Sequence, residues 1–165
     1  MEGVIEEQTG FTRDGISENE WRSFIGGHAD NFIYKWGKAK DPAKCFHWNL
    51  SSFFAGFLWM GYRKMYMELF ILFLLLCPFV IISEIIQSPI VDRLIPIIIG
   101  VTLGLYGNTI YYNFAKRKIK LAKEKGNLDL SIIGGTSWKG VGVALLFFLG
   151  FVIITAGWVW RLGIE

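Results

Sequence analysis

The stretch LFILFLLLCPFVIIS at residues 69–83 contains no charged side chain, and it lies within an apolar segment at residues 65–86. A helix needs roughly 20 such residues to cross about 30 Å of hydrocarbon, because it rises about 1.5 Å per residue. We therefore predict a membrane span here, with a bend at Pro78, where the proline ring removes a backbone hydrogen bond. Segments 94–112 and 141–160 have a similar composition and are predicted to be the second and third spans.

The overall composition agrees with a membrane protein. Of the 165 residues, 53% are hydrophobic and 19% are charged, whereas soluble domains carry about 25% charged residues. No glycine-rich phosphate loop, metalloprotease helix motif or nucleophile elbow occurs in the sequence. We therefore predict an all-α integral membrane protein without enzymatic activity and without a cofactor.

The distribution of basic residues predicts the orientation. Residues 113–139, between the second and third spans, are rich in lysine and arginine, whereas the connection between the first and second spans contains only Arg93. Short loops with excess positive charge stay in the cytoplasm. We therefore predict that residues 113–139 form a basic cytoplasmic loop, that the N-terminus is cytoplasmic and that the C-terminus is outside. The three spans and this loop make up a membrane domain at residues 65–165.

An amphipathic helical segment is predicted ahead of the spans, at residues 17–45. Ser17 and Glu20 have the spacing of a capping box, which marks a helix start. Gly26 and Gly27 each weaken a helix interior by roughly 1 kcal/mol, so the segment is either one helix or two short ones. Apolar residues recur at helical spacing along it, namely Trp21, Phe24, Ile25, Ala29, Phe32, Ile33 and Trp36.

Two further segments complete the predicted organisation. Residues 1–16 are acidic and have no apolar periodicity, so we expect a flexible tail. Residues 46–64 begin with FHWNLSSFFAGFLWMGY, which is aromatic but polar in its first turns. If residues 46–62 also crossed the membrane, the basic residues at 35–44 and the basic residues at 116–125 would lie on opposite sides of it. We therefore predict an interfacial or re-entrant helix, against which the aromatic face of residues 21–36 packs.

Four motifs resemble a family of small bacterial membrane proteins that is catalogued only as domain of unknown function 2628. They are FIGGHADNFIYKW at residues 24–36, FFAGFLWMGYRKMY at 53–66, GNTIYY at 107–112 and GGTS at 134–137. The resemblance implies location in the inner membrane of a bacterial cell, and it implies no activity. This sequence has Gly56 followed by Phe57 where relatives tend to have glycine and proline, and it lacks the cysteine pairs of the metal-binding ribbon that some relatives carry.

Small, aromatic and polar residues mark the surfaces expected to bind or pack. Gly100, Gly104 and Gly107 lie on one face of the second span, where another helix can approach, either within the chain or from a second copy. Lys64 and Glu68 are one helical turn apart, which predicts an ion pair at the cytoplasmic interface. The full set of predicted partner or packing residues is Trp21, Phe24, Phe32, Trp36, Trp48, Trp59, Arg63, Lys64, Glu68, Gly100, Gly104, Gly107, Asn108 and Tyr111.

The basic residues Lys116, Arg117, Lys118 and Lys120 are expected to contact anionic lipid headgroups, each contributing about 1 kcal/mol near the membrane surface. Nucleic acid is not an expected partner, because no base-stacking aromatic residues are interleaved with these bases. A metal site is not expected either. His28, Cys45 and His47 are soft ligands, but the second pair that a closed zinc site needs is missing.

Three functions are compatible with these features. The leading hypothesis is a non-enzymatic protein that binds a membrane partner or copies of itself, as an accessory or regulatory subunit or an immunity-type protector. The second is a small transporter or channel assembled from several copies, which would place polar residues along a shared axis. The third is a lipid-acting membrane enzyme, which would need a cluster of histidine and carboxylate side chains at headgroup level.

Overall fold

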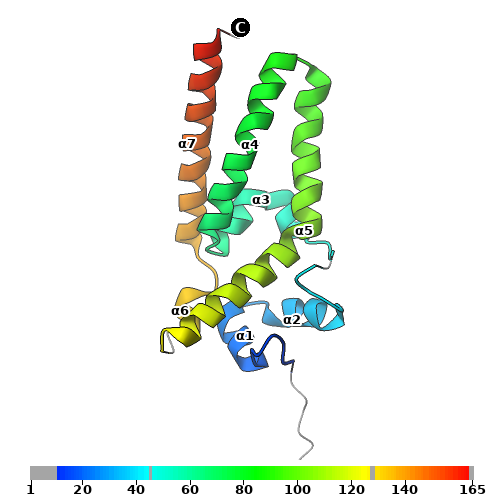
Figure 1. Ribbon diagram of the computed structural model, residues 1–165, viewed down its shortest axis with the longest axis vertical. Coiled ribbons are helices and arrows are strands. Elements are labelled where there is room, and N and C mark those ends of the chain that lie inside the picture. The colour runs from blue at the N-terminus through cyan, green and yellow to red at the C-terminus, as the bar shows by residue number, and fades with distance from the viewer. Residues whose placement is uncertain (1–10, 45, 127–128, 164–165) are drawn as a thin grey trace, which may run out of the picture.

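The computed structural model describes residues 11–44, 46–126 and 129–163. Within these ranges the only strand-like pairing is an isolated bridge between Arg13 and Ile16. The predicted all-α fold is therefore confirmed for the described residues (Figure 1). The helices are α1 Glu18–Ile25, α2 Ala29–Lys38, α3 Leu50–Tyr62, α4 Tyr66–Ile86, α5 Pro89–Glu124, α6 Leu130–Ile133 and α7 Trp138–Leu162.

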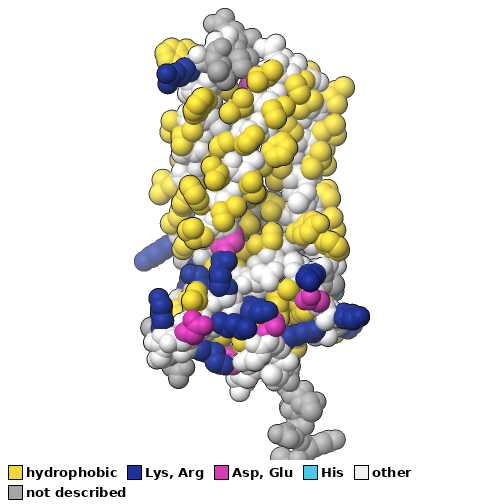
Figure 2. All heavy atoms as spheres, in the orientation of Figure 1, with side chains coloured by type: hydrophobic (Ala, Val, Ile, Leu, Met, Phe, Trp, Pro, Cys, Tyr) yellow, Lys and Arg dark blue, Asp and Glu magenta, His cyan; other side chains and the backbone are white. Residues whose placement is uncertain are grey.

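Among the described residues, three helices are long and apolar enough to span a membrane. They contain the three predicted spans, apart from Met65 at the start of the first. Figure 1 shows α4 standing between α7 and the first part of α5, and α4 packs on both. Within the described residues α5 and α7 do not pack on each other to a comparable extent, so the spans form a row. Figure 2 shows hydrophobic side chains over this row, with basic and acidic side chains gathered mostly at its lower end.

The second span continues further as a helix than predicted. Residues 113–124 belong to α5, so the expected basic loop at 113–139 is wrong over this part. The prediction ended the helix where the apolar run ends, but lysine, arginine, alanine and leucine also favour helix. Ala115, Ile119 and Ala122 lie three or four residues apart and are buried, so packing holds this extension in helical form.

The lower part of the molecule is a cap, which we define as residues 11–44, the end of α5 from residue 111, and α6. Its first helix begins with the predicted capping box: the Ser17 backbone N–H donates to Glu20 Oε2 at 2.7 Å, and the Glu20 N–H to Ser17 Oγ at 3.4 Å. The chain forms two helices and not one, because Gly26 at φ 67° ends α1. Figure 1 shows the second part of α5 crossing below the spans toward α6, near α1 and α2.

The predicted flexible tail at residues 1–16 is wrong for its last six residues, whereas residues 1–10 lie outside the described part. Ile16 is fully buried, and the Phe11 backbone N–H donates to Glu18 Oε2 at 2.7 Å. The Phe11 ring lies 6.4 Å from the Trp21 ring between centroids. The segment lacks periodicity because it is irregular backbone held by these contacts, and not because it is unpacked.

Helix α3 lies across the lower ends of the spans and packs on α5 and α7. Its 13 residues are fewer than the roughly 20 that a span requires. Gly56, at φ 37° and ψ −107°, divides it into two halves. This backbone conformation favours glycine, so the bend forms here although Phe57, and not a proline, follows Gly56.

Candidate functional site

The aromatic residues predicted on the amphipathic segment meet in one buried cluster with the end of α5. Trp21 stacks on Tyr112 at 5.1 Å between ring centroids and meets Trp36 edge-on at 5.3 Å. Phe32 lies 4.9 Å from Tyr111, and Phe24 and Phe114 are 6.0 Å apart. The face is covered as predicted, but mainly by α5 and not by α3. Tyr111 and Tyr112 at the end of the predicted second span, and Phe114 just after it, supply the rings.

Arg63 was predicted as a partner or packing residue, and it is buried, with 4% of its surface exposed. Its guanidinium carbon lies 4.8 Å from the centroid of the Phe32 ring and 5.0 Å from that of Tyr111. The Trp59 ring also contacts Tyr111, at 5.9 Å. Sequence position alone placed Arg63 beside a span, whereas α3 turns its last residues toward the cap.

The predicted small-residue face of the second span packs within the chain. It lies against α3 and against Trp48 and Asn49, the two residues before α3. A Cβ atom on Gly104 would lie 3.1 Å from Phe53 Cβ and 3.2 Å from the Trp48 ring. At Gly107 it would lie 2.5 Å from Ser52 Oγ, and at Gly100 it would lie 3.5 Å from Phe53. The glycines therefore allow α3 to approach α5 closely.

Asn108 joins the same contact by hydrogen bonds. Its Oδ1 accepts from Asn49 Nδ2 at 3.0 Å, and its own Nδ2 donates to the His47 carbonyl at 2.9 Å. Asn49 in turn caps α3 through the Ser52 N–H at 3.0 Å. Asn108 was predicted as a site residue and Asn49 was not, although an asparagine directly before an apolar helix is a recognisable N-cap signal.

The predicted ion pair between Lys64 and Glu68 does not form. Helix α4 begins at Tyr66, and Lys64 lies before it at φ 59°, so the two residues do not share a helical face. Glu68 instead pairs with Arg117, and Lys64 Nζ donates to the Ile132 carbonyl at 2.9 Å.

A recess with a volume of about 330 Å³ is lined by Lys64, Arg117 and Lys118, by the Glu68 carboxylate that pairs with Arg117, and by apolar side chains that include Met67 and Ile71. We call it the basic recess. It contains two of the four bases that were expected to contact lipid. Lys116 points elsewhere, because its Nζ lies 2.9 Å from Asp14 Oδ2. Lys120 does not line the recess either. Helical geometry separates these neighbours in sequence onto different faces.

Two carboxylates, those of Asp14 and Glu20, form ion pairs that join residues 11–25 to α5. Asp14 accepts from Tyr112 and from Lys116, which lowers the pKa of this carboxyl below its ordinary range. Glu20 accepts from Lys123 at 2.8 Å and from the Ser17 backbone, which lowers the pKa of Glu20 as well. Both contacts therefore favour the ionised form in the folded state.

A pH dependence of stability follows from these lowered pKa values. A carboxyl with a lower pKa in the folded state stabilises the fold above its unfolded pKa, and this contribution is lost as the pH falls through the folded pKa. We expect the melting temperature to decrease as the pH is lowered below about 5. The decrease should be smaller in the double variant Asp14→Asn, Glu20→Gln. Each contact contributes about 0.5–1 kcal/mol, since both are partly exposed. Equal pH profiles of the two proteins in thermal denaturation would contradict this assignment.

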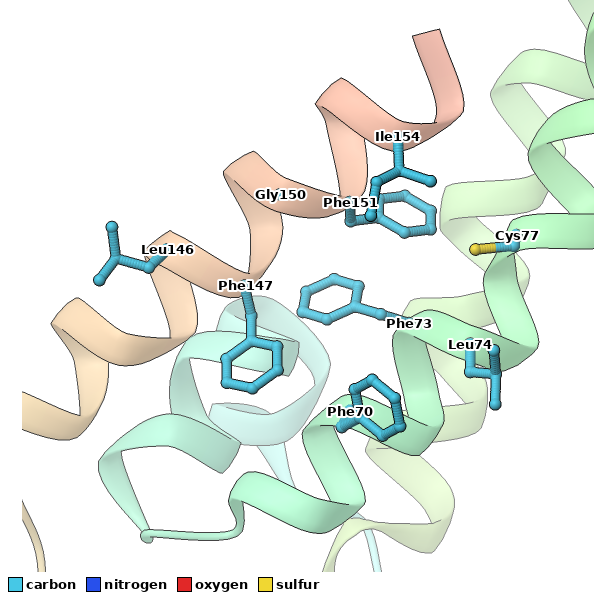
Figure 3. Close-up of a pocket in the computed structure, with 9 residues that line it drawn as sticks. All are labelled: Phe70, Phe73, Leu74, Cys77, Leu146, Phe147, Gly150, Phe151 and Ile154. Atoms are coloured by element: carbon cyan, nitrogen blue, oxygen red, sulfur yellow. The ribbon is translucent and has the colours of Figure 1, made fainter. Parts of the chain in front are cut away.

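An apolar groove of about 520 Å³ runs between α4 and α7, shown in Figure 3. Phe70, Phe73, Phe147 and Phe151 reach into it from the two helices, and Gly150 leaves room on the α7 side, because a Cβ atom there would meet nothing within 4 Å. Cys77 also lines it. We call this feature the α4–α7 groove. Gly150 was not predicted as a site residue, because the sequence does not distinguish a glycine with free space beside it from one packed against a neighbouring helix.

The described residues contain no group of three or more histidine, cysteine or carboxylate residues placed to hold a metal ion. Cys45 lies outside the described residues. The arrangement thus offers packing surfaces, an apolar groove and a basic recess.

Comparison with known proteins gives one match. A family model with the description "Protein of unknown function (DUF2628)" matches residues 6–117. The matched region contains the motifs at residues 24–36, 53–66 and 107–112, whereas the motif at 134–137 and all of α7 lie beyond it. No curated protein and no solved structure matches the chain.

Proposed function

The chain belongs to the DUF2628 family, whose description assigns no activity, and on this premise we propose that it functions by binding. It is a non-enzymatic integral membrane protein that binds another membrane protein, as an accessory or regulatory subunit or an immunity-type protector. A transmembrane helix of this partner occupies the α4–α7 groove.

The observation that carries this proposal is the contrast between the packed glycines of the helices and two open ones in the second half of α7. At Gly61, Gly104, Gly107 and Gly140, an atom of the same chain lies within about 3 Å of the place where a Cβ atom would be. At Gly150 and Gly157, one heptad apart, that space is open. Glycine on a membrane helix lets a second helix backbone approach, so these two positions suit a helix from outside the chain.

The open row of spans supports binding over transport. Helices α4, α5 and α7 stand side by side, and α4 has one neighbour on each side. A row encloses no water-filled route by itself, whereas it exposes apolar faces along its length, including Leu146 at 69% and Ile153 at 72%. Apolar faces of this kind are covered in the membrane by lipid or by another protein.

The test is photo-crosslinking in native membranes from positions Leu146 and Ile154, which line the groove. Ile97 on α5, with 58% of its surface exposed, serves as a lipid-facing control. We expect one membrane protein to be crosslinked from the groove positions and not from the control. The protein identified is then purified, and it should bind the wild type at least tenfold more tightly than the variant Gly150→Leu, a difference of about 1.4 kcal/mol.

Two results would contradict the binding proposal. One is crosslinking to lipid alone from every position, and the other is ion or solute flux through vesicles that contain only this protein. A crosslink to a second copy of the chain, with no other protein, would replace the hetero-partner with self-association.

We also propose that the cap and the basic recess face the cytoplasm of a bacterial cell, with the recess on anionic lipid headgroups. Arg117 and Lys118 lie beside apolar side chains at the start of α4, a combination that suits a headgroup and its acyl chain. Single cysteines replace Asp92, Gly126 and Gly163 in a protein without Cys45 and Cys77. An impermeant thiol reagent outside the cell should label positions 92 and 163 and leave position 126 unlabelled. Labelling of position 126 alone would reverse the orientation.

A further inference from the structure

Arg63 is a buried cation without a carboxylate partner among the described residues. Its Nη1 donates to the Ile25 carbonyl at 3.1 Å and to the Tyr111 hydroxyl at 3.4 Å. Its Nε is buried and has no acceptor in the structure. A buried charge is ordinarily paired, because desolvation of an isolated ion is strongly unfavourable. The flanking Phe32 and Tyr111 rings offset part of this desolvation cost by cation–π contact. A ring face, however, does not accept a hydrogen bond from Nε, whose N–H lies in the guanidinium plane.

Arg63 lines a polar cavity of about 190 Å³ between α2, α3 and α5. The other polar side chains on its wall are His28, Lys35, Ser51 and the amides of Asn31, Asn49 and Asn108. Asn49 and Asn108 each use one amide N–H in the bonds described above, so each retains a second. The wall thus offers cations and donors and no carboxylate, which is the chemistry of an oxyanion site.

A second cavity of about 370 Å³ adjoins the polar one, because both are lined by His28, Ser51, Trp59 and Arg63. It extends in the other direction along Ala55, Leu58 and Val141, which are apolar. The two compartments meet at Arg63, at the junction between the cap and the membrane-spanning helices. A polar compartment joined to an apolar one at this level fits a molecule with an anionic head and an apolar tail.

We propose that the Arg63 cavity binds a phosphate group, with Arg63 and Lys35 as its counter-charges. When this phosphate belongs to a lipid, the acyl chain of the lipid occupies the adjoining cavity. The site is separate from the α4–α7 groove and from the basic recess. The proposal can therefore be confirmed or refuted independently of the binding function proposed above. The phosphate belongs to a lipid headgroup or is free in solution, and the experiment below distinguishes these sources.

The test uses the full chain in a zwitterionic detergent and measures its melting temperature. The probes are short-chain phosphatidic acid, inorganic phosphate and, as the zwitterionic control, short-chain phosphatidylcholine. At a concentration 100 times its dissociation constant, a bound ligand raises the melting temperature of a protein of this size by about 5 °C or more. We expect this rise with phosphatidic acid and none with phosphatidylcholine.

Three variants distinguish binding in the Arg63 cavity from binding elsewhere on the protein. Asn31→Asp places a fixed negative charge on the cavity wall at an exposed position, so the protein folds while the phosphate is repelled. Asn19→Asp makes the same change in the first turn of α1, outside the cavity. Lys118→Gln alters the basic recess. The rise should be largely lost in Asn31→Asp and unchanged in Asn19→Asp, and Lys118→Gln should remove at most the smaller part that the basic recess supplies.

An equal rise with inorganic phosphate, abolished in Asn31→Asp, would support the site and identify its ligand as free phosphate. The proposal is overturned if no anionic probe raises the melting temperature, or if the rise persists in Asn31→Asp. It is also overturned if Lys118→Gln removes the rise, because the lipid then binds in the basic recess.

Discussion

Replacing Gly140 by leucine is expected to prevent stable folding, with a loss of about 3 kcal/mol or more in the free energy of unfolding. Gly140 on α7 and Gly61 on α3 touch through their backbones: a Cβ atom at Gly61 would lie 2.5 Å from the Gly140 carbonyl oxygen and 2.6 Å from Ala144 Cβ. A Cβ atom at Gly140 would in turn collide with the Gly61 carbonyl. Backbone atoms cannot swing aside as a flexible side chain can, so α3 and α7 would separate.

The matched control is Gly142→Leu, two residues along the same helix. A Cβ atom at Gly142 would meet nothing within 4 Å, so this variant keeps the same change in composition and helix propensity without the collision. Thermal denaturation of both variants in detergent measures the difference. Similar melting temperatures for the two would mean that α3 and α7 do not approach each other at Gly61.

The spans could be predicted because hydrocarbon selects residues by composition. The first predicted span, residues 65–86, differs from α4 by one residue. The end of α5 could not be predicted in the same way, since hydropathy reports the surrounding solvent and not where the backbone hydrogen-bond ladder stops. Gly26 and Gly27 indicated a possible break between α1 and α2 but left a single helix equally possible. The end of α1 also makes a distant contact, in which the Gly135 N–H donates to the Phe24 carbonyl at 2.6 Å, and no local pattern predicts that contact.

The candidate surfaces, too, could be predicted only as far as they depend on local sequence. Helical spacing predicted that Trp21 and Trp36 share a face, but their partner Tyr112 lies far away in the sequence, and only the fold brings it near. The pair Lys64 and Glu68 was predicted from spacing on a helix that begins too late to include Lys64. Gly150 and Gly104 occupy similar apolar surroundings in the sequence, yet one is open and the other is packed.

Replacing Trp21 by alanine is expected to destabilise the cap by about 3–5 kcal/mol, the usual range for removing a buried tryptophan. Trp21 is fully buried and joins three parts of the cap, because its ring contacts Phe11, Trp36 and Tyr112. None of these three ring partners belongs to α4 or α7, and the apolar faces of these two helices hold them in the membrane. The variant should therefore lose the cap before it loses the spans. Limited proteolysis should cleave residues 11–44 rapidly and leave a membrane-embedded fragment.

Two substitutions test whether this loss comes from the buried ring. Trp138→Ala removes the same side chain at a position with 79% of its surface exposed, and it should leave the proteolysis rate unchanged. Trp21→Phe keeps an aromatic ring and removes the indole Nε1–H, which is buried without a hydrogen-bond partner in the structure. Because a buried donor without an acceptor is itself unfavourable, this variant should lose much less stability than Trp21→Ala. If phenylalanine destabilises the cap as much as alanine does, the indole N–H has an acceptor in the folded protein, and the cluster is not held by ring packing alone.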